Sequence, residues 1–134
     1  MYLLDTNILS ELLKKHPNKN LINKLGSLPS TSVYTTSICV MELRYGALRR
    51  GDHFDLWSKI ENFILSKLHI LNFSYKDAIK SAEILFELHS KGQPIGIEDV
   101  MIGSIALTNG LELISANTKH FSRIPNLKIE NWLL

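Results

Sequence analysis

The sequence predicts an α/β fold with three layers, in which helices cover both faces of a short parallel sheet of four to five strands. Short apolar and β-branched segments alternate along the chain with longer segments of helical periodicity, a pattern typical of parallel sheets buried on both faces. The chain has 134 residues, which fits one domain spanning residues 1–134. Its composition, 45% hydrophobic and 21% charged, is ordinary for a soluble globular protein.

The first part of the chain is predicted to form two strands separated by two short helices. Tyr2–Leu4 is a run of large apolar residues, typical of a short buried strand. A helix is predicted over Ile8–Lys15 and stops near Pro17, because proline interrupts helices. Leu21–Leu25 is predicted as a second short helix. Ser32–Thr35 follows as the second strand, since it is β-branched and aromatic.

Three helices and a strand are predicted in the middle of the chain. Apolar residues recur at helical spacing in two neighbouring segments, Ile38, Met41, Tyr45 and Leu48, and then Trp57, Ile60, Phe63 and Ile64. His69–Phe73 is predicted as the third strand. Ser74 opens the next helix, with Asp77 as a capping-box-like partner. The apolar stripe of that helix consists of Ala78, Ile79, Ala82, Leu85 and Phe86.

The last part of the chain is predicted to hold a buried helix and two more strands. A loop at residues 91–96 precedes Val100–Leu107, which is apolar nearly all round and is therefore expected to be buried on several sides. Leu113–Ser115 is predicted as the fourth strand and Leu127–Glu130 as the fifth.

Composition excludes several classes of protein. No apolar run approaches the ~20 residues of a membrane-spanning helix, and the N-terminal segment lacks the features of a signal peptide. Cys39 is the single cysteine, which excludes an internal disulfide and a cysteine zinc cage and suits the reducing cytoplasm. The net charge of +2 does not by itself indicate a nucleic-acid-binding protein.

Three of the thirteen acidic residues stand in apolar surroundings, where an unpaired carboxylate is costly. Asp5 ends the first strand, Glu42 lies in an early turn of the helix after the second, and Asp99 directly precedes an apolar helix. Ligands of open parallel sheets bind at the carboxyl ends of the strands. The three carboxylates are expected to meet at that edge, where Asn117 follows the fourth strand.

Carboxylates held together repel one another and raise each other's pKa, a conflict that a divalent cation removes. Oxygen ligands without thiolates or paired histidines favour Mg²⁺ or Mn²⁺ over zinc. The predicted chemistry is phosphodiester hydrolysis by a water that the metal activates and orients.

Each of these residues also has a structural interpretation. Asp5 could cap the helix that follows it, and Asp99 could complement a helix N-terminus. Glu42 could pair with Arg44 or Arg49, and Asn117 could be a turn residue. Independent caps, however, have no reason to share one edge of one sheet, so the set favours a metal site.

Four blocks of the sequence resemble PIN-domain toxins of the VapC type. They are Leu4–Ile8, Met41–Ala47, Pro94–Gly103 and Leu113–Phe121, and the similarity continues through Ile124–Trp132. The resemblance therefore covers essentially the whole chain, and four blocks in this order are specific where a single one would be weak.

The resemblance implies a PIN-like α/β/α domain with Mg²⁺- or Mn²⁺-dependent endoribonuclease activity. It also implies an RNA substrate, a homodimer and a small inhibitory antitoxin, through which alone the protein would contact DNA. It assigns metal binding to Asp5, Glu42 and Asp99. The fourth position, commonly Asp in the wider PIN group, is Asn117 here, which we expect to position a water or a phosphate oxygen.

Further residues have expected supporting roles. Thr6 and Ser115 are expected as hydroxyl partners beside the metal, and Asn7 as a residue that orients Asp5 or caps its helix. Lys119 and His120 could contact RNA phosphates, or could lie in a solvated loop. Arg44 and the neighbouring arginines at 49 and 50 suit either phosphates or an acidic antitoxin tail.

Tyr45 and Phe121 could stack on bases, although core packing is the favoured expectation for both. A homodimer is also expected from apolar surface, because Val100–Leu107 and the helix at Ile8–Leu13 expose more apolar faces than one sheet contact covers.

Three other functions compete with a toxin. A catalytically silent binding module is disfavoured by the intact set of acidic residues. A PIN nuclease that processes RNA would share the site, but the short chain has no added RNA-binding module. A phospho-receiver domain requires an aspartate after its third strand, where this sequence has Leu71-Asn72-Phe73.

Overall fold

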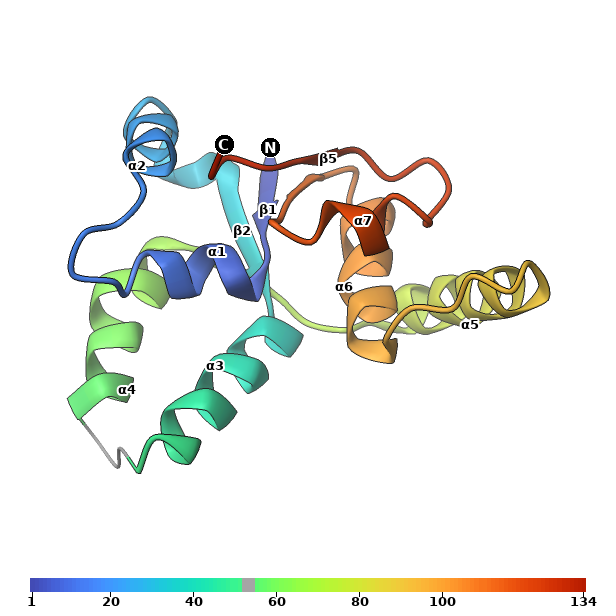
Figure 1. The fold of residues 1–134 in the computed structure, drawn as a ribbon, viewed down its shortest axis with the longest axis horizontal. Coiled ribbons are helices and arrows are strands. Elements are labelled where there is room, and N and C mark those ends of the chain that lie inside the picture. The colour runs from blue at the N-terminus through green and yellow to red at the C-terminus, as the bar shows by residue number, and fades with distance from the viewer. Residues whose placement is uncertain (52–54) are drawn as a thin grey trace.

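The computed structural model describes residues 1–51 and 55–134, which form one five-stranded parallel sheet flanked by helices. The strands are β1 (Tyr2–Leu4), β2 (Val33–Thr36), β3 (His69–Leu71), β4 (Glu112–Ile114) and β5 (Ile129–Glu130), in the order β3-β2-β1-β4-β5. Helices α1, α3 and α4 gather on one side of β1 and β2, and α5, α6 and α7 on the other (Figure 1). The α/β prediction with a parallel sheet is confirmed.

The central strand β1 sets the register that builds the site. It pairs in parallel with β2 and β4, so that Leu4 aligns with Ile114. The ladder continues one residue beyond β1, because the Asp5 amide donates to the carbonyl of Ile114 over 3.0 Å. The residues that follow β1, β2 and β4 therefore meet at one edge, as the sequence predicts.

The α-helices are α1 (Thr6–Glu11), α2 (Lys19–Gly26), α3 (Ser37–Arg49), α4 (Asp55–Lys59), α5 (Tyr75–Ser90), α6 (Ile97–Thr108) and α7 (Thr118–Phe121). All but α7 follow the prediction with shifted ends, and α7 was not predicted. The helix predicted to include Ile64 ends as α4 at Lys59 and continues as a π-helix over Ile60–Ile64. Helix α1 begins earlier than the predicted Ile8, because Asp5 is its N-cap and accepts a hydrogen bond from the Thr6 amide. Helix α5 has the expected capping box between Ser74 and Asp77.

Helix α6 is buried on several sides, as predicted. Its buried residues are Val100, Ile102, Gly103, Ser104, Ile105 and Ala106. Part of this burial comes from α5, where the Ser81 hydroxyl donates to that of Ser104 over 2.8 Å inside the core. Ile8 and Leu9 of α1 are also fully buried, and no large hydrophobic residue of Val100–Leu107 or Ile8–Leu13 is among the exposed ones. These two segments therefore do not supply the exposed apolar surface expected to drive dimerisation, although Ile97 at the start of α6 is exposed. Within the described residues, no helix combines the length and apolar character needed to cross a membrane.

The apolar stripes predicted for α3 and α5 face solvent in the isolated chain. On α3, Met41, Tyr45 and Leu48 are exposed, and the residues that pack inward are Ile38, Cys39, Leu43 and Ala47. On α5, Ile79 and Phe86 are exposed, while Ile84 and Leu88 pack inward. The expected core position of Tyr45 is wrong, since the residue is 62% exposed, whereas that of Phe121 is confirmed.

Candidate active site

The three carboxylates and Asn117 line one cavity at the carboxyl edge of the sheet. Its volume is about 580 Å³, and its walls comprise Asp5, Thr6, Asn7, Ser10, Glu11, Lys14, Glu42, Asp99, Asn117 and Leu133. The acidic residues come from the end of β1, the second turn of α3 and the first turn of α6. The predicted convergence of distant parts of the chain is thus found.

Asp5 is held rigidly by groups on three sides. It is 4% exposed, and one carboxylate oxygen accepts from the Thr6 amide over 2.8 Å. The other accepts from the Ser115 hydroxyl over 2.7 Å and from the Asn7 amide group over 3.1 Å. Asp5 is therefore both the cap of α1 and a member of the cluster, and the two interpretations of this residue do not exclude each other.

Asn7 and Ser115 join the ends of β1 and β4 behind this carboxylate. The Asn7 side-chain oxygen accepts from the Ala116 amide over 3.1 Å. The Ser115 hydroxyl accepts from the Asn117 amide over 2.9 Å while it donates to Asp5. The contact of Asn7 with Asp5 is the orienting contact expected for Asn7, and Ser115, expected as a hydroxyl partner beside the metal, also contacts this carboxylate.

Glu42 faces the cavity and accepts a hydrogen bond of 2.6 Å from the Thr6 hydroxyl. It does not pair with the arginines that the structural interpretation offered. Arg44 lies over the ring of Trp57, and Arg49 lies over the ring of Tyr45. Among the described residues Glu42 has no cationic partner, and its charge remains directed at the cavity.

Asp99 is accompanied by an amide and an imidazole. The Asn117 side-chain nitrogen donates to Asp99 over 3.2 Å and lies 3.1 Å from Nδ1 of His120. That imidazole nitrogen is 3.7 Å from the Asp99 carboxylate. Asn117 therefore contacts an acidic residue directly, and His120 lies at the rim on the short helix α7.

Burial and crowding raise the pKa of all three carboxyl groups. For Asp5 the main cause is burial, which outweighs the hydrogen bonds from Ser115 and Thr6. For Glu42 burial again comes first, and the charge of Asp5 adds to the increase in pKa. For Asp99, burial and then the charge of Glu42 raise the pKa. The cluster is therefore strained electrostatically when no cation neutralises it.

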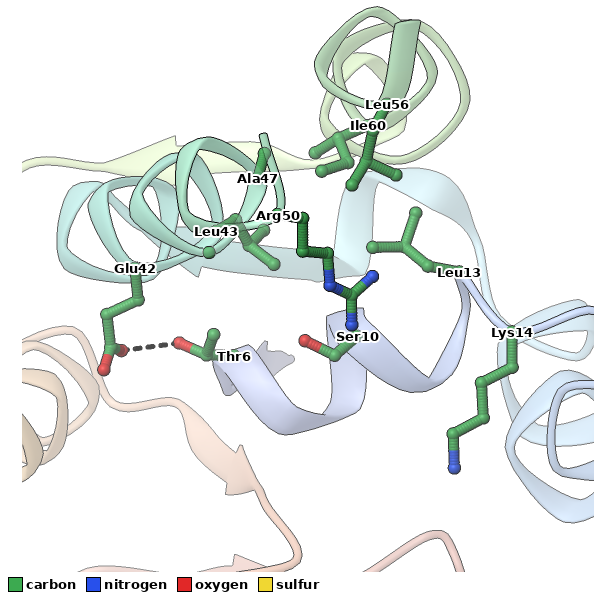
Figure 2. A pocket seen from close by; sticks show the side chains of 11 residues that line it. Thr6, Ser10, Leu13, Lys14, Glu42, Leu43, Ala47, Arg50, Leu56 and Ile60 are labelled. Carbon is green, nitrogen blue, oxygen red and sulfur yellow. Dashed lines mark hydrogen bonds between the residues drawn. The ribbon is translucent and has the colours of Figure 1, made fainter. Parts of the chain in front are cut away.

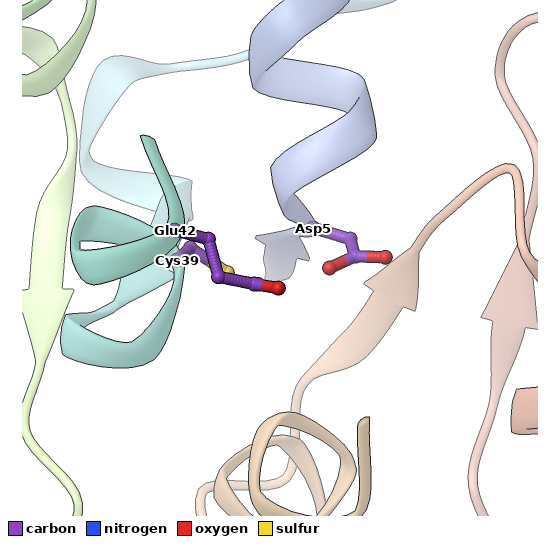
Figure 3. Close-up of side chains that lie close together, drawn as sticks. All are labelled: Asp5, Cys39 and Glu42. Carbon is purple, nitrogen blue, oxygen red and sulfur yellow. The ribbon is translucent and has the colours of Figure 1, made fainter. Parts of the chain in front are cut away.

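Cys39 lies beside this cluster, a placement that sequence reasoning missed. One ligand atom each from Asp5, Cys39 and Glu42 lie within 4.8 Å of one another, and all three side chains appear together in Figure 3. Burial, and next the charge of Asp5, raise the pKa of the Cys39 thiol. A neutral thiol is a weak ligand, so the carboxylates remain the effective donors.

The residues present fit a hard divalent cation. The donors are carboxylate oxygens whose negative charges repel one another, with hydroxyl and amide groups holding them in place. Oxygen donors of this kind suit Mg²⁺ or Mn²⁺. The cavity is also open enough to admit a substrate phosphate, which Mg²⁺ sites commonly use as a further ligand.

The predicted phosphate contacts differ in their placement. His120 lies at the rim, and Lys119 is exposed on α7. Arg44 packs against Trp57, has a buried guanidinium nitrogen without a hydrogen-bond partner, and is not among the described residues lining the acidic cavity. A phosphate contact by Arg44 is therefore not supported by its surroundings.

A second cavity of about 290 Å³ adjoins the first and shares some of its residues (Figure 2). Its walls are Thr6, Ser10, Leu13, Lys14, Glu42, Leu43, Gly46, Ala47, Arg50, Leu56 and Ile60. Sequence reasoning mentioned Arg50 only as a member of an arginine run. Glu42, Gly46 and Arg50 follow one another at four-residue intervals, and this spacing could have indicated that they share one face of α3.

Known proteins are similar to this chain over nearly its whole length. The PIN domain family matches residues 2–127. "Ribonuclease VapC2" of Rickettsia felis is 37% identical over 98% of this chain and 98% of its own length. The "tRNA(fMet)-specific endonuclease VapC" of Salmonella typhimurium is 34% identical over 98% of this chain and 97% of its own. The crystal structure of VapBC2 from Rickettsia felis bound to a promoter DNA fragment contains a chain that superposes with a TM-score of 0.89 at 38% identity, covering 98% of both chains.

Proposed function

The chain belongs to the PIN-domain family as a VapC-type ribonuclease, the toxin of a toxin–antitoxin pair, and on that premise we propose that Asp5, Glu42 and Asp99 bind the Mg²⁺ or Mn²⁺ with which it cleaves RNA. The observation that carries this proposal is the meeting of three carboxylates with raised pKa values in one open cavity. Carboxylates so crowded are best explained by a cation between them.

A bound divalent cation would supply an activated water and would neutralise charge that develops on the phosphate. The chain's own residues fix the ligand geometry. Ser115 and Asn7 hold Asp5, and Thr6 holds Glu42, through hydrogen bonds of 2.6–3.1 Å. Such outer contacts commonly change metal affinity or activity by about 10–100-fold. We assign Asn117 the role of holding Asp99 and presenting a neutral amide to a phosphate oxygen.

We propose transfer RNA, and initiator transfer RNA first, as the substrate. The support is the 34% identity to an endonuclease named for tRNA(fMet), over nearly the whole of both chains. The test is incubation of the purified chain with initiator and elongator methionine tRNAs in Mg²⁺. Hydrolysis by water should leave a 5′-phosphate and a 3′-hydroxyl, which end-labelling and ligation detect. Products that end in a 2′,3′-cyclic phosphate would contradict water attack, and equal cleavage of both tRNAs would contradict the substrate.

The proposed partners are RNA, an inhibitory antitoxin and, through the antitoxin, DNA, in the cytoplasm. The support is the similarity to chains from VapBC complexes that crystallised with DNA, in the Rickettsia felis complex with a fragment of the promoter. An RNA-processing nuclease without an antitoxin is disfavoured, because the two relatives compared above match over nearly their whole length and are named VapC.

We propose that the chain also forms a homodimer through the exposed stripes of α3 and α5. Phe86 on α5 is 77% exposed, and monomers seldom leave clusters of large apolar side chains uncovered. Light scattering should give the mass of a dimer, and Phe86→Glu should shift it towards that of a monomer. Ile22→Glu changes an exposed apolar residue on α2 and should leave the mass unchanged. A monomeric wild-type chain at tens of micromolar would rule out the dimer.

A further inference from the structure

The cavity beside the acidic cluster is lined by two matched rows of side chains. Thr6 and Ser10 lie one turn apart on α1, and Lys14 follows four residues later. Opposite them on α3, Glu42, Gly46 and the C-cap Arg50 lie at the same intervals. Residues four apart share one face of a helix, so Thr6 and Ser10 face the groove from α1, and Glu42, Gly46 and Arg50 face it from α3. Lys14 lies beyond the end of α1 and lines the same cavity.

The chemical type of the side chains in the two rows differs from one end of the groove to the other. At the first end Thr6 and Glu42 are joined by a hydrogen bond of 2.6 Å beside the carboxylate cluster. In the middle, the groove is kept open by the small side chain of Ser10 and by Gly46, which has no side chain and where an added Cβ would meet nothing within 4 Å. At the far end the side chains are the cations Lys14 and Arg50.

Arg50 is the cation of this end that is available to a ligand. Lys14 is engaged with Glu11 in an ion pair of 2.8 Å. Arg50 is exposed, makes no ion pair with any residue that the structure describes, and extends across the groove towards Ser10 in Figure 2. Arg49, its neighbour, is directed instead over the ring of Tyr45.

Proximity to the C-terminus of α3 does not account for this orientation. A cation near a helix C-terminus is favourable, but Arg49 in the last turn meets that need equally well. Arg50 differs from Arg49 in lining the cavity that is continuous with the acidic site. Glu42 and Arg50 are eight residues apart, which at ~1.5 Å per residue separates them by about 12 Å along the helix.

We propose that Arg50, with the Ser10 hydroxyl, forms a phosphate subsite that holds the RNA backbone beside the cleaved linkage. This inference rests on the proposed ribonuclease site. Arg50 can hold a neighbouring phosphate of the same RNA strand only if the scissile phosphate lies at the acidic end of the groove. A guanidinium binds phosphate oxygens with two donors at once, and a hydroxyl adds a third. The contact is made to the backbone, so it is independent of base sequence.

The test measures binding of a short fluorescein-labelled single-stranded RNA by anisotropy over a series of KCl concentrations. All chains carry Asp99→Asn and are kept in Mg²⁺, so that the RNA stays intact. Arg50→Ala should weaken binding about fivefold at low salt. It should also lower the slope of log affinity against log salt by about 0.7, the value for one phosphate contact on a single strand. Arg49→Ala is the matched control and should change neither quantity.

The same substitutions in the active chain provide a second measurement. Arg50→Ala should lower kcat/KM by the same factor as it lowers affinity, and Arg50→Lys should restore part of the loss. If neither protein cleaves RNA, the proposed activity fails, while the salt slope still reports on the subsite. An unchanged slope in Arg50→Ala, or an equal fall in Arg49→Ala, would overturn the subsite. Unchanged RNA binding together with weaker binding of the antitoxin would assign Arg50 to a partner carboxylate instead.

Discussion

Asp99→Asn should abolish RNA cleavage, with a fall in kcat/KM of about a thousandfold or more, while the protein remains folded. The substitution keeps the shape of the side chain and removes one of the three charges proposed to hold the cation. The hydrogen-bonding frame around Asp5 is separate from Asp99 and should survive, since it is formed by Ser115, Asn7 and Thr6. Single-turnover cleavage of initiator tRNA in Mg²⁺ measures the loss.

The same variant should be as stable as the wild type, or slightly more stable, when metal is absent. Burial and the charge of Glu42 raise the pKa of Asp99, so the ionised group destabilises the metal-free fold. A neutral amide removes that repulsion. Glu98→Gln is the matched control for cleavage, because Glu98 is the exposed neighbour in the same turn and is not among the residues lining the acidic cavity. Its charge is the last of the causes that raise the pKa values of Glu42 and Asp99, so its effect on stability should be smaller than that of Asp99→Asn. Near-normal turnover in Asp99→Asn, or an equal loss in Glu98→Gln, would remove Asp99 from the site.

The position of the carboxylates could be predicted from sequence because topology alone determines it. Asp5 directly follows a strand, and parallel strands present their carboxyl ends at one edge. The helix containing Asp99 had to begin at that edge, since it leads into β4. None of these steps depends on side-chain rotamers, so they need only the order of the elements.

The buried faces of α3 and α5 could not be predicted in the same way. Both helices carry apolar residues on more than one face, so periodicity identifies a helix but not the side that packs inward. In α5 the inward face includes Asp77 and Ser81, polar residues that become acceptable in the core through hydrogen bonds to Thr108 and Ser104. Those bonds join residues distant in sequence, which a local pattern does not reveal.

Sequence reasoning offered Arg44, Arg49 and Arg50 together for phosphate binding and could not tell which of them faces the cavity. Arg44 and Arg50 are six residues apart, which at ~3.6 residues per turn directs them about 120° apart around the helix axis, so they do not share one face of α3. The choice depends on whether Trp57 packs against Arg44, which is a contact between two helices. Cys39 escaped notice for the same reason, because its proximity to Asp5 arises where α3 crosses the end of β1.

Removal of the cation should stop cleavage, and its addition should stabilise the fold by an amount that grows with pH. The pKa values of Asp5, Glu42 and Asp99 are raised in the metal-free fold, so the folded chain binds protons more tightly than the unfolded chain. Without metal, the contribution of these three groups to stability is therefore fully present below the ordinary carboxyl range, about pH 4, and is lost as pH rises through the raised pKa values.

A bound cation reverses that loss, because it stabilises the ionised carboxylates and competes with protons for them. At a Mg²⁺ concentration about 100-fold above its Kd, the gain in unfolding free energy should be about 2.7 kcal/mol. Melting curves in Mg²⁺ and in excess chelator, recorded from pH 4.5 to 8, should diverge as pH rises, and the divergence should shrink in Asp99→Asn. Cleavage that persists in chelator, or a Mg²⁺ shift in Tm that is the same at every pH, would show that these carboxylates do not hold the catalytic cation.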